Sequence, residues 1–318
     1  MTDLRSSLDR ALQLERSGDA AGARREAEAA LAGDPNNPQL LQFLGRLSCR
    51  NGRLAEGEAY LRKSFELVPD AIEVRADLAM ALAALGRGDE ALPLCDEGAA
   101  AAGGAFLTRI RGQILQSMNR HAAAAEAYER VVELESGDWE AWNNLGSVRW
   151  ALGDLAGAVT ALRRAAALRP HMVPIHANLG AILAAAGELE EALAAYQRAL
   201  ALAPGEPRLV INAAKLLRQL GRHQQALDFL RAAPNDPDVE IERGRSLSAL
   251  RRLDQAEQAY RSAIRGRRGF VEAHLELGLV LERAGRVHEV EPLLAQAGAD
   301  GVAAESLGYL RALLLESQ

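Results

Sequence analysis

The side chains best suited to binding another molecule are three asparagines that recur at a fixed interval. Asn144, Asn178 and Asn212 lie 34 residues apart, and the chain holds only nine asparagines. A carboxamide offers one hydrogen-bond acceptor and two donors. If the three side chains form one row, each could pair with both backbone groups of an extended peptide. The spacing therefore predicts a peptide-binding ladder of asparagines.

Basic residues accompany the last of these asparagines. They are Arg208, Lys215, Arg218 and Arg245. The chain as a whole is acidic, with a formal net charge of −6. A local basic wall in such a chain favours an acidic peptide segment or a C-terminal carboxylate. The alternative is that these residues form an ordinary solvated face.

Residues that could perform catalysis or hold a metal ion are scattered. His176 and His274 occupy equivalent positions on an apolar stripe, where packing is the expected role, and the other histidines have no partners at metal-ligand spacing. Cys49 and Cys95 have neither metal-ligand spacing nor a disulfide framework. The sequence contains no phosphate-binding glycine loop and no nucleophile elbow. We therefore expect a non-enzymatic protein without a metal or cofactor.

Small residues recur at one position of a repeat. Glycine fills this position at Gly45, Gly112, Gly146, Gly180, Gly244 and Gly278, and alanine fills it at Ala11, Ala79 and Ala214. Successive members are separated by 34, 34, 33, 34, 34, 34, 30 and 34 residues. Self-similarity at this period is typical of a stacked array, in which each unit contacts only its neighbours. Such an array offers an extended surface rather than a single catalytic pocket.

The unit at residues 139–172 shows how the repeat would fold. Its first half has an apolar stripe at helical spacing, formed by Trp142, Leu145, Val148 and Leu152. Gly153 would end this helix in the left-handed conformation, and Asp154 would cap a second helix that Pro170 ends. Gly146 and Ala158 would let the two helices approach closely where they cross. Each unit is thus predicted to be a helix–turn–helix pair.

The turn signal recurs in the other units. Glycine holds the turn at Gly18, Gly52, Gly86, Gly153, Gly187, Gly221 and Gly285. Asn119, which tolerates the same backbone conformation, replaces glycine in the fourth unit, and Arg251 is an exception in the eighth. The third unit ends in the run Gly98–Gly104, and the seventh is short and ends in Pro234–Pro237. These two irregular segments are candidate hinges.

This pattern resembles the tetratricopeptide repeat. The resemblance rests on Trp142, Leu145, Gly146, Ala158, Leu162, Ala165 and Pro170. It implies an all-α, right-handed superhelical solenoid of helix–turn–helix repeats covering residues 4–300. The expected units are 4–37, 38–71, 72–104, 105–138, 139–172, 173–206, 207–236, 237–270 and 271–304.

By this resemblance, the first helices form a concave groove that is faced by helix positions 2, 5, 6, 9, 12 and 13. The three asparagines of the ladder occupy position 6, Asn143 occupies position 5, and the four basic residues occupy positions 2, 9 and 12. The rows could also reflect family drift without any ligand. The lysine and asparagine pair of chaperone-binding members is not reproduced, because Asn143 and Ser147 stand in the fifth unit instead.

The predicted function is a protein-interaction scaffold that binds an extended peptide or protein segment in the groove. The alternative is the substrate-recognition arm of a larger enzyme, such as a sulfotransferase, glycosyltransferase or oxygenase, with its catalytic domain beyond residue 318. A pI near 5.7 argues against a nucleic-acid partner, because contacts with phosphates need a basic surface. Without a signal peptide or a long apolar run, we expect no membrane span and a cytoplasmic protein. The chain has 35 arginines, only two lysines and much alanine, which indicates a bacterial source with a GC-rich genome.

Residues 302–318 are predicted to form one more helix. It is either a capping helix, which could also mediate self-association, or the first helix of a truncated tenth unit. The consecutive residues Leu313, Leu314 and Leu315 motivate both interpretations. They spread over much of the helix circumference, so some would need a covering surface.

Overall fold

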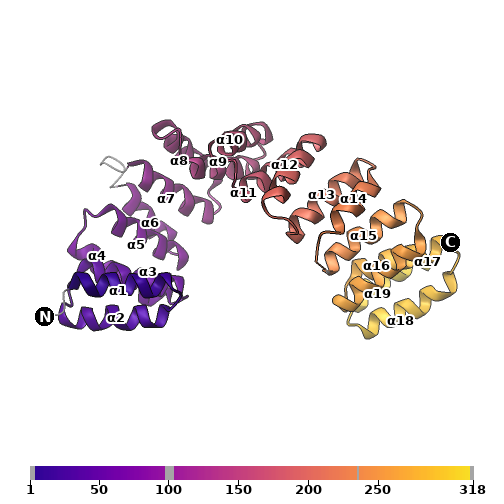
Figure 1. Ribbon diagram of the computed structural model, residues 1–318, viewed down its shortest axis with the longest axis horizontal. Helices are drawn as coiled ribbons and strands as arrows, with labels where there is room; N and C mark the ends of the chain where they lie inside the picture. The colour runs from indigo at the N-terminus through magenta and orange to yellow at the C-terminus, as the bar shows by residue number, and fades with distance from the viewer. Residues whose placement is uncertain (1–3, 97–103, 235, 316–318) are drawn as a thin grey trace. The chain divides into compact units, whose positions relative to one another are not determined.

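The computed structural model describes residues 4–96, 104–234 and 236–315. Regular structure in these ranges is entirely helical. The chain divides into two compact units, Met1–Leu168 and Arg169–Gln318. Each unit is a stack of helix pairs that follow one another along the sequence (Figure 1). The predicted all-α array of helix–turn–helix repeats is confirmed.

The first unit contains five helix pairs within its described residues. Their bounds are α1 (Leu4–Arg16), α2 (Ala20–Gly33), α3 (Pro38–Arg50), α4 (Leu54–Leu67), α5 (Ile72–Ala84), α6 (Gly88–Asp96), α7 (Gly104–Ser117), α8 (His121–Leu134), α9 (Trp139–Ala151) and α10 (Leu155–Leu168). Odd-numbered helices are the first helices of the repeats. Even-numbered helices are the second helices.

The second unit continues the same alternation. Its helices are α11 (Val173–Ala185), α12 (Leu189–Leu202), α13 (Pro207–Gln219), α14 (His223–Leu230), α15 (Pro237–Ala249), α16 (Leu253–Gly266), α17 (Val271–Arg283), α18 (Val290–Ala299) and α19 (Ala304–Leu315). A short 3-10 helix, η1 (Val287–Glu289), precedes α18.

The turns between paired helices use one backbone conformation. Every glycine predicted for this turn has a positive φ, for example 84° at Gly153 and 72° at Gly221. Asn119 has a φ of 57°, which confirms its predicted role. Arg251, the apparent exception, also adopts this conformation with a φ of 60°. Arg251 therefore differs from the other turn residues in its side chain but not in its backbone conformation.

The small residues are found where the paired helices cross. A Cβ atom added to Gly146 would lie 2.7 Å from Cγ of Leu162 and 3.2 Å from the carbonyl oxygen of Ala158. Leu162 and Ala158 are fully buried. Asp154 caps the following helix, because its Oδ1 accepts a hydrogen bond of 2.9 Å from the Gly157 amide. Both features agree with the sequence prediction.

Two predicted details differ from the structure. Leu145 and Val148 are buried, whereas Leu152 is 49% exposed. The reason is that α9 ends at Ala151, so Leu152 is its C-cap residue and lies beyond the buried stripe. The last helix begins at Ala304 and not at Val302, although Val302 itself is buried beside it.

Helix α19 packs on α17 and α18. Leu310 is fully buried and Leu307 contacts the same hydrophobic core, while Tyr309 is 60% exposed. The side chains of Leu313, Leu314 and Leu315 lie outside the described residues, as do Gly98–Gly103 of the third unit and Asn235 of the seventh.

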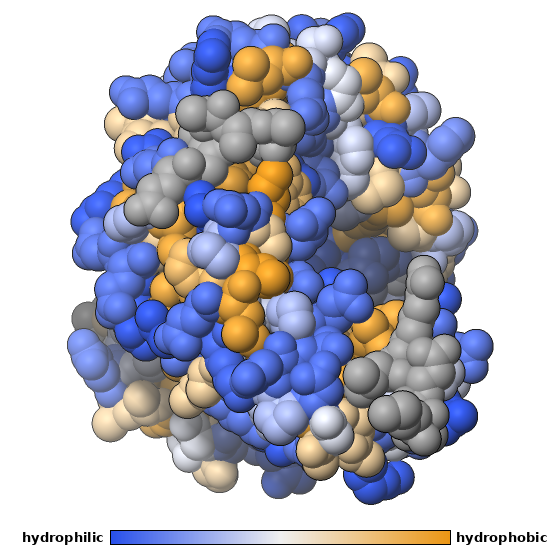
Figure 2. All heavy atoms as spheres, turned by 90° about the vertical axis from the view of Figure 1, so that its left-hand side faces the viewer, coloured by the Kyte–Doolittle hydropathy of each residue, from blue (hydrophilic) through white to orange (hydrophobic). Residues whose placement is uncertain are grey.

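Figure 2 shows the face of the molecule at the N-terminal end of the chain. Hydrophilic residues make up most of this face, and hydrophobic atoms show between them. Large hydrophobic side chains that are exposed in the first unit are Leu67, Met80, Phe106, Leu134, Trp150 and Leu152.

Candidate functional site

The first helices of the second unit line a groove. We name it the first-helix groove, and it is lined by Arg208, Ile211, Asn212 and Lys215 of α13, Asp238, Ile241, Glu242 and Arg245 of α15, and Glu272 of α17. These residues occupy helix positions 2, 5, 6 and 9. The structure therefore brings together Arg208, Asn212, Lys215 and Arg245. Arg218, at position 12, reaches the same network through Glu242.

Asn212 is held by a tyrosine of the preceding repeat. The Tyr196 ring packs on Gly180, where an added Cβ atom would lie 3.0 Å from it. Its hydroxyl hydrogen-bonds with the Asn212 side chain. Burial raises the pKa of Tyr196, and the bond with Asn212 opposes that shift. The hydroxyl stays neutral, so it holds the carboxamide at the groove without adding charge.

In the first unit, Asn144 also interacts with a tyrosine, but more of its hydrogen-bonding groups are occupied. Tyr128 packs on Gly112, and its hydroxyl donates to Gln116 Oε1 over 3.0 Å and hydrogen-bonds with Asn144. Asn143 Nδ2 donates to Asn144 Oδ1 over 3.3 Å. The chain itself thus occupies both ends of the Asn144 carboxamide, which leaves less capacity for a peptide than sequence spacing implies.

The three asparagines of the predicted ladder are divided between the two compact units. Asn144 lies in α9 of the first unit, whereas Asn178 in α11 and Asn212 in α13 belong to the second. Helices α11 and α13 contact one another, and both asparagines are partly buried. Within the second unit, position 6 therefore presents two successive asparagines.

Two members of the basic wall are paired with carboxylates. Glu242 is only 1% exposed. Its Oε1 lies 2.9 Å from Nη1 of Arg245, and its Oε2 lies 3.4 Å from Nε of Arg218. Arg245 also donates to Glu276 over 2.7 Å. Burial alone would lower the pKa of Arg245, but hydrogen bonds with Glu276 and Glu242 outweigh it and raise the pKa.

The consequence is that Arg218 and Arg245 are structural rather than free cations. A buried carboxylate without its partners costs several kcal/mol, so Glu242 needs both arginines. In the sequence, Glu242 stands at position 6, where three preceding repeats have asparagine. The sequence does contain a signal for this network. An acidic residue at position 6 of α15 is followed by a basic residue at position 9 and by another acidic residue at position 6 of α17.

Arg208 and Lys215 differ from the other two cations. Both are exposed at the first-helix groove. Among the residues that the structure describes, neither takes part in an ion pair. The groove's carboxylates have other partners, since Asp238 pairs with Arg267 over 2.7 Å and both Glu242 and Glu272 face Arg245. Arg208 and Lys215 thus carry the unmatched positive charge of this surface.

Position 4 of the first helices has a structural role that the sequence did not reveal. Trp142 Nε1 donates to the Ser136 carbonyl over 3.0 Å, and His176 Nε2 lies 2.8 Å from the Pro170 carbonyl. Arg75 donates to the carbonyl six residues before it in the same way. Three different residue types therefore fasten the loop between repeats with a side-chain nitrogen. This explains His176 without any ligand.

Two further sequence candidates for chemistry, His274 and Cys95, are buried. His274 is 1% exposed, and its Nδ1 lies 3.0 Å from the Phe270 carbonyl. Cys95 is fully buried, and burial raises the pKa of its thiol to about 12. In residues 4–96, 104–234 and 236–315, no three His, Cys, Asp or Glu side chains are grouped as a metal site would require. No helix in those ranges combines the length and apolar character needed to cross a bilayer.

Comparison with protein families gives a consistent result. A family profile described as tetratricopeptide repeat matches residues 8–72, 111–173, 145–207 and 241–305. Two further profiles with that description match residues 183–251 and 72–97. Together these matches cover well over half of the chain. None of the curated proteins compared with the chain matches it in sequence.

Comparison with solved structures gives further matches. The type IV pilus biogenesis factor PilW superposes with a TM-score of 0.60 at 16% identity, covering 68% of this chain and 99% of its own. YrrB, described as a TPR protein with an unusual peptide-binding site, has a TM-score of 0.47 at 17% identity and covers 59% of this chain and 98% of its own. A repeat protein from Parabacteroides merdae has a TM-score of 0.48 at 14% identity, covering 87% and 98%.

Proposed function

Because the chain belongs to the tetratricopeptide repeat family, whose arrays serve as scaffolds for protein–protein interaction, we propose that its first-helix groove binds an extended, acidic peptide segment. The observation that carries this proposal is the pair of unmatched cations, Arg208 and Lys215, on either side of Asn212. We propose no catalytic role for the chain.

The distances along α13 suit an extended peptide. Arg208 and Lys215 are seven residues apart on one helix, which corresponds to about 10 Å. About three residues of extended chain span this distance. A peptide could therefore place carboxylates near both cations while a backbone group between them pairs with Asn212. Charge-assisted hydrogen bonds of this kind are stronger than neutral ones.

The tyrosine behind Asn212 supports the same function. A carboxamide that is already oriented loses less side-chain entropy when it binds. Tyr196 provides that orientation from the preceding repeat. We accordingly propose Asn212 as the main amide contact of this groove. Peptide contacts at Asn178, and separately at Asn143 and Asn144 of the first unit, stay predictions.

Selection from a display library of random peptides tests this function. The immobilised chain should enrich extended sequences rich in Asp and Glu. Replacing Arg208 and Lys215 together by Glu should then weaken binding of the selected peptide by about tenfold or more, equivalent to at least ~1.4 kcal/mol. Arg25→Glu with Arg198→Glu reverses two charges at exposed positions of α2 and α12. This matched control should leave binding nearly unchanged.

Two results would contradict this proposal. Selected peptides without acidic bias would remove the acidic-segment hypothesis. An affinity indifferent to the Arg208 and Lys215 substitutions, and to ionic strength, would exclude the first-helix groove as the binding surface.

A further inference from the structure

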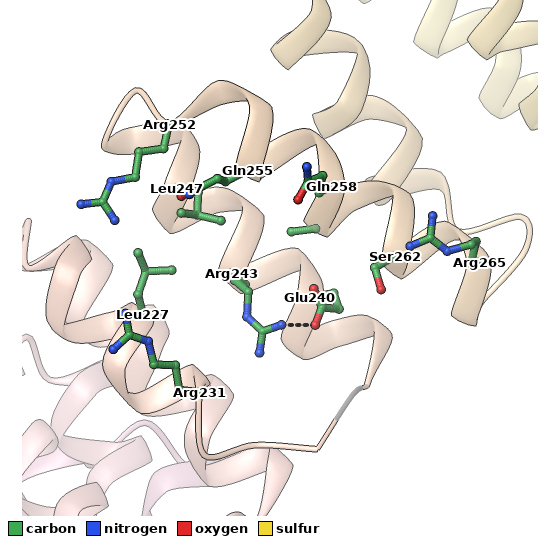
Figure 3. Close-up of a pocket in the computed structure, with 11 residues that line it drawn as sticks. Leu227, Arg231, Glu240, Arg243, Leu247, Arg252, Gln255, Gln258, Ser262 and Arg265 are labelled. Atoms are coloured by element: carbon green, nitrogen blue, oxygen red, sulfur yellow. Dashed lines mark hydrogen bonds and ion pairs between the residues drawn. The ribbon is translucent and has the colours of Figure 1, made fainter.

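Helix α14 is shorter than its counterparts. It has 8 residues, whereas α12 and α16 have 14 each. Six residues of α-helix correspond to about 9 Å. A pocket opens beside the end of α14, between α14, α15 and α16 (Figure 3). We name it the α14–α16 pocket, and its lining residues include Leu227, Arg231, Glu240, Arg243, Arg252 and Arg265.

An arginine of this pocket occupies a position that is normally part of the core. The residue before the small residue of the repeat is a buried leucine in most units: Leu44, Leu78, Leu145, Leu179 and Leu277. In α15 this residue is Arg243. Its Nη2 donates to the Leu230 carbonyl at the end of α14 over 3.0 Å, and its Nη1 pairs with Glu240. The shortened helix is thus accompanied by a polar wall instead of an apolar one.

The pocket carries an excess of positive charge. Four arginines line it against the single carboxylate of Glu240, which is 4% exposed and paired with Arg243. Arg231 lies 3.3 Å from Asp228, but both side chains are more than half exposed and such pairs are weak. Arg252 and Arg265 take part in no ion pair within the described ranges. A ligand of opposite charge would match these two side chains.

Helix α16 supplies the long wall of the pocket. Gln255, Gln258 and Ser262 lie along one side of it, between Arg252 and Arg265 (Figure 3). The two arginines are 13 residues apart, or about 20 Å along the helix axis. About six residues of extended peptide span that length. Glutamine side chains can both donate to and accept from peptide groups.

We propose that the α14–α16 pocket is a second binding site, which takes an acidic segment of another protein in extended conformation. Arg252 and Arg265 would contact carboxylates near the two ends of the segment. Gln255 and Gln258 would pair with its backbone. This site lies on the second-helix side of the array and uses none of the residues of the first-helix groove.

Fluorescence anisotropy with a labelled hexaglutamate peptide tests the site. The measurement uses the full chain carrying Arg208→Glu and Lys215→Glu, so that the first-helix groove no longer attracts anions. Hexaglutamate should still bind, and added Arg252→Glu and Arg265→Glu should weaken binding by about tenfold or more. Arg25→Glu with Arg198→Glu makes the same change in net charge elsewhere and should have little effect.

A charge-neutral variant separates recognition from general attraction. Gln255→Ala with Gln258→Ala should weaken hexaglutamate binding severalfold without altering helical content, while labelled hexaglutamine should not bind. Equal affinity of hexaglutamate for the Arg252 and Arg265 variant and for its control would overturn the proposal. So would an oligouridylate that binds these arginines more tightly than hexaglutamate, because the pocket would then suit a nucleic acid.

Discussion

The position of a residue in the repeat determines which backbone conformation or side-chain contact it must adopt. The turn residue Arg251 illustrates this, since it has a φ of 60° where every other repeat but one uses glycine. An L-residue in this conformation is strained by about 1–2 kcal/mol, and glycine avoids that strain. The larger backbone entropy of unfolded glycine offsets roughly 0.5–1 kcal/mol of the gain.

We therefore expect Arg251→Gly to stabilise the chain by up to about 1 kcal/mol. The reverse type of change, Gly221→Ala, should destabilise it by about 1 kcal/mol, because Gly221 has a φ of 72°. Midpoints of urea unfolding measure both effects. A fall in the midpoint for Arg251→Gly would show that the arginine side chain contributes more than its backbone costs.

Asp77 carries a second prediction about a single residue. Burial raises its pKa, and a hydrogen bond of 2.7 Å from Gln42 together with Arg46 only partly opposes this. The folded-state pKa thus lies above the unfolded one, so folding takes up protons in that range and stability falls as pH rises through it. Asp77→Asn removes this cost and keeps an acceptor for Gln42.

We expect Asp77→Asn to be more stable than the wild-type chain at neutral pH. The difference should shrink as the pH falls through the pKa of Asp77 and vanish in more acidic solution. Urea unfolding at a series of pH values measures it. A stability difference that stays constant over the whole series would mean that the charge of Asp77 is not the cause.

Much at this level could be predicted from the sequence, and the failures have a physical cause. The left-handed turns could be predicted from the glycines and Asn119, because the conformational preference of these residues determines the local backbone conformation. The bond between Tyr196 and Asn212 could not, because it joins two repeats through a side chain 16 residues away. The burial of Glu242 likewise depends on arginines supplied by its own helix and by α13.

Contacts between neighbouring helices determine which polar groups remain available for binding. In α15, Glu242 pairs with Arg245 and Arg218 and is almost fully buried. Replacing it by alanine leaves two cations without their common partner. We expect Glu242→Ala to destabilise the chain by roughly 1–3 kcal/mol, because it removes charged hydrogen bonds while both arginines are partly exposed and Arg245 keeps Glu276.

The matched control for this prediction is Glu272→Ala. Glu272 also faces Arg245, but at 3.7 Å and with a 60% exposed side chain, so its loss should cost less than about 1 kcal/mol. Thermal or urea unfolding compares the two variants. Similar losses of stability in both would contradict the assignment of Glu242 as the centre of the network.

Tyr196 connects α12 with the groove residue Asn212 in the next repeat. Tyr196→Phe keeps the ring that packs on Gly180 but removes the hydroxyl. We expect a stability loss of about 1 kcal/mol, typical of one hydrogen bond, together with weaker binding of an acidic peptide. Tyr60→Phe is the control, because Tyr60 lies one residue away from the equivalent position and does not pack on the repeat's glycine. Peptide affinity that is unchanged in Tyr196→Phe would show that Asn212 needs no positioning.

The whole chain is an array that divides into two compact units between Leu168 and Arg169. This boundary lies at the end of α10, and the hinges suggested by the sequence at the third and seventh repeats stay predictions. In a repeat array, stability is approximately a sum of repeat and nearest-neighbour terms. We therefore expect a fragment of residues 169–318 to retain most of its helical content, measured by circular dichroism. A largely unfolded fragment would show that the second unit depends on the first.

The most direct test of the proposed binding function is hydrogen exchange on the whole chain with and without a selected acidic peptide. If the peptide occupies the first-helix groove, amides of α13 and α15 should be protected in the complex, and the Arg208→Glu and Lys215→Glu chain should show no such protection. Protection confined to second helices, or a pattern unchanged by those substitutions, would contradict binding in the first-helix groove.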